Sequence, residues 1–274
     1  MFHWYHAFIL ACADAAGDVR GARTSDAIMR AAQNYLPTPI DAMREKIFAI
    51  IPAAGTGTRL GDALPKQYLD VNGLPMIFHA LSVLSRVARI EKITIILSPQ
   101  DTHWELLMAR PSDQFGGRIG TLRVGGQTRG ASVLNGLNAM ADEMNANDWV
   151  MVHDAARPCI RVELIEQFID ELQDDVIGGL LALPLSDTIK LNAGNLRVEK
   201  TLDRADIWRA QTPQMFRYGM LRTAMTRMID ATDEAQAIEA LGHQPKLVMG
   251  DSANLKVTYA PDLKLARMLL SEEH

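Results

Sequence analysis

The stretch that decides the fold spans residues 50–60 and reads I-I-P-A-A-G-T-G-T-R-L. A short apolar run leads directly into this loop of small residues. The pattern is typical of a buried parallel strand that ends at a phosphate-binding turn. Gly55 and Gly57 allow the backbone to approach a ligand closely, and Ala53 and Ala54 leave room for a base or a sugar. We therefore expect a nucleotide to bind at the end of this strand.

Two basic residues accompany the loop, Arg59 at its end and Lys66 within P-K-Q at residues 65–67. They can neutralise phosphates that face exposed backbone N–H groups. The loop is not a P-loop, and it is not a dinucleotide fingerprint either, since Leu60 occupies the third glycine's place. Taken by itself, the segment is also compatible with an ordinary glycine-rich connection between a strand and a helix.

Length and composition predict one main domain. The chain has 274 residues, of which 48% are hydrophobic, enough for one large core. A formal charge of -5 and a pI near 5.8 argue against non-specific nucleic-acid binding, which needs a net basic face. Anionic ligands must therefore be met by local basic clusters.

The cysteines and the apolar runs indicate a cytoplasmic location. Cys12 and Cys159 lie far apart without a metal-binding pattern, so we expect free thiols in a reducing compartment. The longest run of small or apolar residues, 176–185, is much shorter than the roughly 20 residues that span a bilayer.

Residues 1–45 are expected to form an extension outside the fold, followed by one domain over 46–274. The extension is predicted to contain a helix around 25–35, and Met43 is a candidate start. Residues 7–12 resemble a short signal-peptide core, but no Lys or Arg precedes them. A deletion to Met43 is therefore expected to preserve folding and activity.

From residue 47 onward, apolar patterns alternate between strand and helix. The predicted strands are 47–52, 92–98, 121–125, 149–153 and 176–183. Helical spacing relates the apolar residues of two intervening segments, namely Val133, Leu134, Leu137, Met140 and Met144, and Leu164, Ile165, Phe168, Ile169 and Leu172. This order predicts an α/β fold with a single Rossmann-like, mostly parallel sheet covered by helices on both faces. Ligands of such sheets bind at the carboxyl ends of the strands.

The predicted strand 121–125 ends in G-G-Q-T-R, with Ser132 shortly after. The glycines again permit a close backbone approach, here to the base of the nucleotide. Gly126, Gln127 and Ser132 are therefore candidates for the base-binding loop.

The predicted strand 149–153 ends in H-D-A-A-R-P. Asp154 stands where a carboxylate can hold a magnesium ion that bridges phosphates, and Arg157 can form a fork onto a second phosphate. A helix N-cap is the alternative role for Asp154. His153 is interpreted as a packed, structural histidine, because no second histidine lies at metal-ligand spacing.

Residues 186–191 and 196–200 flank the turn N-A-G-N, which predicts a β-hairpin. A hairpin with so many polar residues is unstable by itself in water. We therefore expect it to be an arm that packs against a partner.

The motifs taken together resemble one family, the 2-C-methyl-D-erythritol 4-phosphate cytidylyltransferases of non-mevalonate isoprenoid synthesis. The resemblance covers residues 47 to about 270 and rests on the following series in the family's order: P-A-A-G-x-G-x-R, P-K-Q, H-D-A-A-R-P, D-T-x-K, T-P-Q-x-F, T-D-E-A and N-x-K-V-T. It implies transfer of a cytidylyl group from CTP to a sugar-alcohol phosphate, with Mg²⁺, in a homodimer whose arms cross over.

The resemblance also assigns roles to single residues. Arg59 and Lys66 would stabilise the transition state. The CTP pocket would be lined by Ala53, Ala54, Gly55, Gly57, Gly126, Gln127, Ser132, Asp154 and Ala155. The acceptor would be met by Arg157, Thr212, Thr232 and Lys256, joined by Thr188 and Arg204 from the partner's arm; Lys256 and Arg204 also count among the catalytic cations.

The residue types agree with this chemistry. A phosphate monoester with a second pKa of about 6 is largely dianionic at neutral pH, so it can attack the α-phosphate of CTP without a general base. Catalysis would then rest on alignment and charge stabilisation. Gln127 departs from the family pattern, in which an acidic residue is common, and no fused second domain is expected after Leu270.

Three other readings are compatible with parts of the pattern. A ribitol 5-phosphate cytidylyltransferase would share the fold and the donor. An NAD-dependent oxidoreductase would need an acidic residue at a second strand end, where Leu97, Ser98 and Pro99 stand instead. A non-catalytic nucleotide-binding module would have no need for both Arg59 and Lys66.

Overall fold

The computed structural model describes residues 45–55, 64–108, 115 and 117–271. The predicted extension, its helix and the Met43 start lie outside these residues, as do Gly57 and Arg59. No helix of the described residues is long and apolar enough to cross a membrane.

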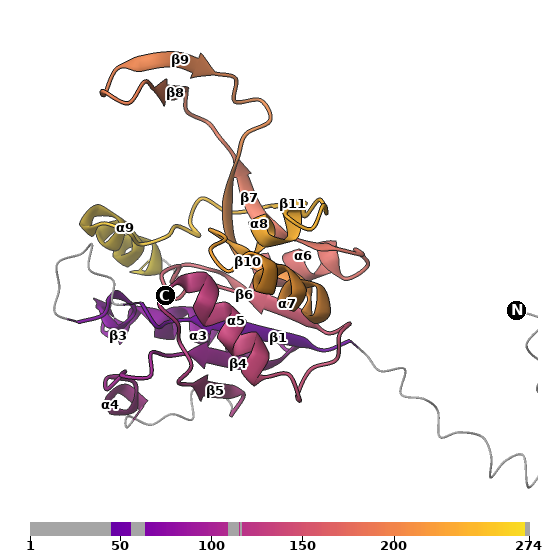
Figure 1. Cartoon of the computed structure of the whole chain (residues 1–274). Coiled ribbons are helices and arrows are strands. Elements are labelled where there is room, and N and C mark those ends of the chain that lie inside the picture. Colours follow the sequence, from indigo (N-terminus) through magenta and orange to yellow (C-terminus); the bar gives the residue numbers. More distant parts are fainter. Residues whose placement is uncertain (1–44, 56–63, 109–114, 116, 272–274) are drawn as a thin grey trace, which may run out of the picture. The chain divides into compact units, whose positions relative to one another are not determined.

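A seven-stranded sheet forms the centre of the domain (Figure 1). In spatial order its strands are β11 (Lys246–Met249), β7 (Gly178–Pro184), β10 (Trp208–Arg217), β6 (Trp149–Val152), β1 (Ile47–Pro52), β4 (Ile90–Ile96) and β5 (Ile119–Leu122). All neighbouring pairs are parallel except those of β10, which runs antiparallel to both β6 and β7. The predicted, mostly parallel sheet is confirmed.

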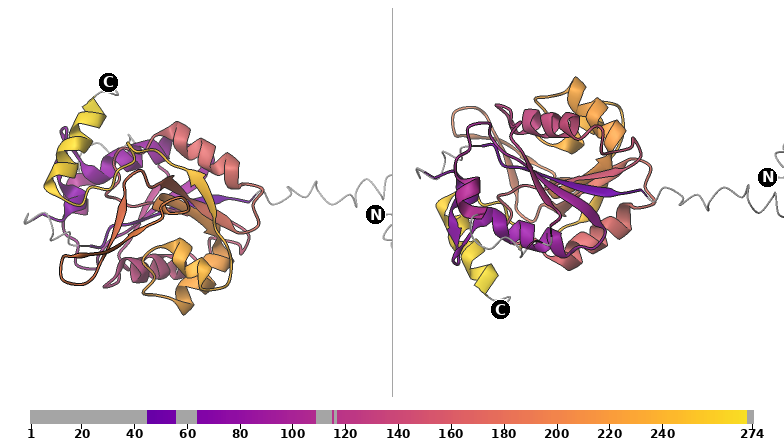
Figure 2. Two further views of the ribbon diagram at one scale, coloured as in Figure 1. Left: turned by 90° about the horizontal axis from the view of Figure 1, so that it is seen from above. Right: turned by 90° about the horizontal axis from the view of Figure 1, so that it is seen from below.

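Helices cover both faces of this sheet, as Figure 2 shows from above and below. One face packs against α3 (Met76–Arg86) and α6 (Val162–Leu172), and the other against α5 (Arg129–Ala139), α7 (Tyr218–Arg227) and α8 (Glu234–Glu239). Because β1 and β6 lie between two hydrophobic layers, their residues are buried on both sides, which explains the continuous apolar runs in the sequence.

Smaller elements complete the domain at its periphery. They are the 3₁₀ helix η2 (Lys66–Tyr68), the two-stranded ribbon of β2 (Asp70–Val71) and β3 (Leu74–Pro75), the short α4 (Trp104–Met108), and α9 (Ala260–Ser271). The last of these packs Ala266 into a small cluster around Val71 and Val257.

The predicted elements match the observed ones closely. The five predicted strands correspond to β1, β4, β5, β6 and β7, with ends displaced by a few residues. All five apolar residues predicted for the second helix are buried in α6, whereas α5 ends at Ala139, so that both Met140 and Met144 of the first prediction lie beyond it. The strands β10 and β11 were not predicted.

Strand β10 is irregular at its centre. Ala210 pairs with Ala182 and Gln214 pairs with Leu180, so residues 211–213 of β10 lie opposite the single residue Leu181 of β7. Pro213 has no N–H to donate, which suits it to such an unpaired position. The bulge directs Gln211 and Thr212 towards the end of β6, where both become buried.

The predicted hairpin is present as β8 (Ile189–Asn192) and β9 (Val198–Leu202), which pair antiparallel. It projects from the ends of β7 and β10, away from the sheet (Figure 1). Leu196 in its turn is 95% exposed and Val198 is 62% exposed. The arm therefore leaves apolar surface in solvent within this single chain.

Candidate active site

A cavity of about 530 Å³ opens at the carboxyl ends of β1 and β6, beside the loop that follows β5. It is lined by Pro52, Ala53, Ala54, Gly55, Lys66, Gln67, Gly126, Gln127, Thr128, Arg129, Ser132, Asp154, Ala155, Ala156 and Lys256. Its position is where an open α/β sheet binds ligands. The chain therefore brings together most of the residues expected to hold CTP.

A larger hollow of about 880 Å³ lies over α6 and beside β11, but it is a poor phosphate site. Acidic side chains line most of it, among them Glu163, Glu166, Asp170 and Glu171. Like charges repel a triphosphate, so the cavity at the strand ends is the candidate.

The loop after β1 is fixed from both sides. The N–H of Ala53 donates to the carbonyl of Ile96 on β4 at 2.9 Å, and the carbonyl of Ala53 accepts a hydrogen bond from the Gln67 side chain at 2.7 Å. Gly55 is exposed, and a Cβ at this position would meet no atom of the described residues within 4 Å. The first part of the loop is thus held rigidly while Gly55 is exposed.

Lys66 begins the 3₁₀ helix η2, next to the buried Gln67 that binds the β1 loop. Its Nζ lies 3.4 Å from the carbonyl oxygen of Val257. Lys66 and Lys256 both line the cavity. Two ammonium groups from segments far apart in the sequence therefore reach the same cavity.

The predicted base-binding loop packs tightly against the β1 loop. A Cβ on Gly125 would overlap the methyl group of Ala54 and lie 2.7 Å from the carbonyl oxygen of Leu97. The N–H of Gly126 donates to Oγ of Ser132 at 3.1 Å, and the Ser132 hydroxyl donates to the carbonyl of Thr128 at 2.9 Å. The absence of a side chain at Gly125 thus allows this loop to pack against the loop after β1. The hydrogen bonds of Ser132 stabilise the turn between residues 126 and 132.

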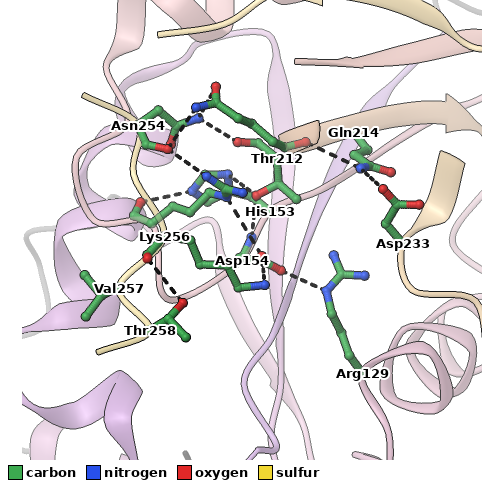
Figure 3. Close-up of polar contacts among 12 residues, drawn as sticks. Arg129, His153, Asp154, Thr212, Gln214, Asp233, Asn254, Lys256, Val257 and Thr258 are labelled. Atoms are coloured by element: carbon green, nitrogen blue, oxygen red, sulfur yellow. Dashed lines mark hydrogen bonds and ion pairs between the residues drawn. The ribbon is translucent and has the colours of Figure 1, made fainter. Parts of the chain in front are cut away.

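Asp154 is the buried centre of the site (Figure 3). Its Oδ1 accepts from Arg129 Nε at 2.8 Å, and its Oδ2 lies 2.8 Å from Lys256 Nζ. Burial by itself would raise the pKa of this carboxyl, but the charges of Arg129 and Lys256 hold its pKa well below the usual range. Asp154 is therefore an anion at any pH near neutrality.

The alternative role of Asp154 as a helix N-cap is wrong. The next helix, α6, begins only at Val162, and Arg161 occupies its N-cap position. Asp154 instead lies in the turn after β6, where its N–H donates to Oγ1 of Thr212 at 3.0 Å.

Arg157 is buried, and its side chain is hydrogen-bonded to the backbone of another segment. Its NH1 group donates to the carbonyl of Asn254 at 2.7 Å, and its Nε lies 3.9 Å from Oδ2 of Asp154. Burial lowers the pKa of this guanidinium, which the Asp154 charge partly offsets. In this conformation Arg157 supports the segment that carries Lys256, two residues beyond Asn254.

His153 is structural, as expected from the sequence. It is fully buried, with Nε2 lying 3.2 Å from the carbonyl of Arg157 and Nδ1 lying 3.2 Å from Oγ1 of Thr212. Burial lowers its pKa to about 4, although the Asp154 charge acts in the opposite direction. The ring is therefore neutral near pH 7 and cannot act as a cationic phosphate ligand.

Of the predicted acceptor residues only Lys256 lines the cavity, and Arg157, Thr188, Arg204, Thr212 and Thr232 do not. Thr188 and Arg204 are exposed on and beside the arm, and Thr232 is exposed immediately before α8. Thr212 is buried beneath Asp154 and is bonded to it. Thr188 and Arg204 stay predictions that depend on a second copy of the chain.

Two important contacts were missed from the sequence. Arg129, the first residue of α5, binds Asp154 with Nε and binds Glu234 with NH1 and NH2 at 2.7 and 3.0 Å. Gln67 was quoted only as part of a motif. Gln67 belongs to the P-K-Q motif and Arg129 to the G-G-Q-T-R stretch, but their contacts depend on which loops and helix ends meet in space.

The donor set fits a magnesium ion held mainly by substrate. No cluster of three or more His, Cys, Asp or Glu side chains that could hold a metal exists among the described residues. Mg²⁺ in nucleotide sites commonly takes one or two carboxylates and completes its shell with phosphates and water. Asp154 is a single ionised carboxylate that lines the cavity, and a carboxylate has about four lone-pair positions, of which the two cations use two.

Fold and site together define a nucleotidyltransferase. The sheet presents small-residue loops and lysines at its carboxyl edge, around one ionised aspartate. Such an edge binds a nucleoside triphosphate and stabilises the negative charge that develops when pyrophosphate is displaced from it.

Comparison with known proteins identifies the family. Residues 47–272 match the family model described as 2-C-methyl-D-erythritol 4-phosphate cytidylyltransferase. A protein of that name from Thiobacillus denitrificans is 51% identical over 232 residues, which cover 83% of this chain and 98% of the relative. Another from Dechloromonas aromatica is 49% identical over 223 residues, covering 81% and 96%. The chain belongs to the 2-C-methyl-D-erythritol 4-phosphate cytidylyltransferase family.

Solved structures agree with this assignment. The crystal structure of the Francisella tularensis enzyme of the same name is 34% identical, with a TM-score of 0.69 over 82% of this chain and 99% of that one. A crystal structure of a 4-diphosphocytidyl-2C-methyl-D-erythritol synthase is also 34% identical and has a TM-score of 0.72, covering 82% and 98%. The likeness therefore extends over almost the whole of each solved chain.

Proposed function

We propose that the cavity at the strand ends holds CTP and that the chain transfers its cytidylyl group to 2-C-methyl-D-erythritol 4-phosphate. The products are 4-diphosphocytidyl-2-C-methyl-D-erythritol and pyrophosphate. The observation that carries the proposal is that Lys66, Lys256 and Asp154 line one cavity together with the two small-residue loops.

The acceptor phosphate supplies its own nucleophile. An oxygen of the dianionic phosphate attacks the α-phosphorus of CTP, and the bond from that phosphorus to pyrophosphate breaks. No proton has to be removed, so no general base is required. This agrees with His153, the buried histidine at the end of β6, being fully committed to structural contacts.

The lysines lower the barrier electrostatically. Two anions must approach each other, and negative charge builds on the leaving pyrophosphate, so cations fixed at the cavity wall stabilise the transition state more than the separated substrates. We assign this role to Lys66 and Lys256, and to Arg59 on the β1 loop by family resemblance. Asp154 would hold Mg²⁺ beside the phosphates. The bound ion would neutralise negative charge on the triphosphate.

The arm is proposed to complete the acceptor site of a second copy. Thr188 and Arg204 are exposed, and the hairpin carries exposed Leu196 and Val198. A hairpin of this kind gains stability from packing against another surface. We therefore propose a homodimer in which each arm brings Thr188 and Arg204 to the partner's acceptor, while Arg157, Thr212 and Thr232 belong to the site's own chain.

Location and domain boundaries follow from the same reading. Cys12 and Cys159 lie far apart in the sequence and form no metal-binding pattern, which suits a reducing compartment. We propose a cytoplasmic enzyme whose catalytic domain comprises residues 46–274, with residues 1–45 as an extension outside it.

A competition assay tests the reaction. Purified protein with CTP and Mg²⁺ is offered methylerythritol phosphate or ribitol 5-phosphate, and pyrophosphate release is measured. We expect turnover with the first acceptor only. Preference for ribitol 5-phosphate, or stabilisation against heat by NADH and not by CTP with Mg²⁺, would refute the proposal.

A substitution tests the electrostatic mechanism. Lys66→Ala is expected to lower kcat about a hundredfold or more, because removal of one contact that stabilises transition-state charge has a cost of this size. The exposed Lys264→Ala on α9 is the matched control and should keep full turnover. Wild-type turnover in Lys66→Ala would rule out the assigned role.

A further inference from the structure

Glu234 is a fully buried carboxylate that the reaction described above does not use. It is the first residue of α8, is 0% exposed, and follows the N-cap residue Asp233. An ionised carboxylate is very costly to bury without a partner. Both of its oxygens are engaged by Arg129, at 2.7 Å to NH1 and 3.0 Å to NH2.

This pairing fixes the orientation of the Arg129 guanidinium relative to Asp154. A guanidinium is planar and presents its donors in a fixed fork, so the two contacts with Glu234 fix the plane of the group. Its remaining nitrogen, Nε, then points at Oδ1 of Asp154 at 2.8 Å. The end of α8 thereby sets the orientation of a carboxylate that lies 80 residues earlier in the chain.

The contacts of the neighbouring charged groups show that Glu234 is the carboxylate that pairs with the terminal nitrogens of Arg129. Asp233 accepts hydrogen bonds from Gln214 Nε2 and from Gln236 N, each at 2.9 Å, so each of its carboxylate oxygens has a partner other than Arg129. Lys256 and Arg157 approach Asp154 at Oδ2, which leaves Oδ1 to Arg129. Removal of the Glu234 charge would therefore free Arg129 alone among the cations near Asp154.

We propose that Glu234 is a positioning residue for catalysis, which holds Arg129 so that Asp154 is presented to the cavity in one orientation. The inference rests on the proposed function, since it deepens the role of the same site. Arg129 in turn holds Asp154: three of its five N–H donors are committed to carboxylates of the protein, two to Glu234 and one to Asp154.

The test begins with the ligand-free protein. The Nε–H signal of Arg129, identified by its loss in Arg129→Lys, should exchange slowly with solvent in the wild type. In Glu234→Gln it should exchange at least about tenfold faster, because the hydrogen bond to Asp154 is no longer held in place. An unchanged signal in Glu234→Gln would overturn the inference, whatever the enzyme does with CTP.

The second arm measures transfer. Glu234→Gln should lower kcat about 10- to 100-fold and raise the Mg²⁺ concentration needed for tight CTP binding, as is typical when an outer partner of a site carboxylate is lost. Glu239→Gln removes the same charge at the exposed end of α8 and is the control. Equal behaviour of the two variants would reject the role of Glu234, whereas a wild type without transfer would reject the proposed function and leave the first arm valid.

A double variant covers the case in which Glu234→Gln does not fold. Arg129→Gln with Glu234→Gln removes both charges, which is far less destabilising than removing one. We expect this protein to fold and still to show the transfer defect, because Asp154 has lost its guanidinium. Wild-type transfer in the double variant would contradict the inference.

Discussion

The side-chain amide of Gln67 donates a 2.7 Å hydrogen bond to the backbone carbonyl of Ala53, and both residues are buried. This bond joins the segment that carries Lys66 to the loop that follows β1. This hydrogen bond thus helps to fix the position of Lys66, the proposed catalytic lysine, relative to the loop after β1.

Gln67→Leu removes the donor and leaves the carbonyl of Ala53 buried and without this partner. We expect the free energy of unfolding to fall by about 1–3 kcal/mol, the usual cost of such a group, and CTP to bind more weakly. Urea unfolding and calorimetric titration with CTP measure the two effects. The exposed Gln167→Leu on α6 should change neither, and a wild-type affinity for CTP in Gln67→Leu would contradict the bracing role.

Gly125→Ala should separate loop packing from loop flexibility. Its new methyl group would overlap Ala54 and crowd the carbonyl oxygen of Leu97, so we expect a loss of about 1–3 kcal/mol in stability. Gly55→Ala is the matched control, because no atom of the described part of the chain lies within 4 Å of a Cβ at that position. Thermal unfolding of both variants checks the prediction, which fails if the two melt at the same temperature.

The neutral, buried His153 predicts a loss of stability in mild acid. Its pKa is about 4 in the folded protein and 6.5 when unperturbed, so the unfolded chain binds the extra proton between these values. The stabilisation is complete above about pH 6.5 and is lost as the pH falls towards 4. The free energy of unfolding should be about 2 kcal/mol smaller at pH 5 than at pH 7 from this group alone.

Urea unfolding in metal-free buffer at the two pH values measures this effect. His153→Gln should show a smaller difference between pH 5 and pH 7, whereas His243→Gln, on the turn before β11, should keep the wild-type difference. Identical pH dependence in His153→Gln and the wild type would show that the ring titrates normally.

Mixing of inactive proteins tests whether Arg204 acts across the dimer. A heterodimer of Lys66→Ala and Arg204→Ala subunits has one site with both substitutions and one with neither, if Arg204 serves the partner's site. Equal mixing with free exchange then restores roughly a quarter of wild-type turnover, since half of the dimers are mixed. If no activity returns although exchange is demonstrated, Arg204 acts within its own chain or has no role.

Much of the fold follows from local sequence, because the apolar runs of β1 and β6 and the helical spacing of α6 are strong patterns. Strand β10 escaped because Pro213 and the polar Gln211 and Thr212 interrupt it, features typical of a loop. Strand β11 is only four residues long and lies at the edge, where half-exposed Leu247 and Met249 weaken the apolar signal.

The site was predictable where function depends on strand ends. Asp154 and the β1 loop follow directly from the rule that parallel strands place their carboxyl ends together. The contacts of Arg129 were not predictable, because they require the start of α5 to meet both the start of α8 and the turn after β6. Family resemblance predicts which residues matter, but it does not reveal that Arg157 is buried against the carbonyl of Asn254.

The bulged strand β10 connects the arm to the residues around Asp154. Only seven residues separate Arg204, at the base of the arm, from Thr212, beneath Asp154, and the backbone between the two can span at most about 29 Å. In the proposed dimer, a displacement of the arm would be transmitted along this segment to the Thr212 hydroxyl, which accepts a hydrogen bond from the N–H of Asp154. Packing of the arm against its proposed partner and the position of Asp154 would then be coupled through residues 204–212.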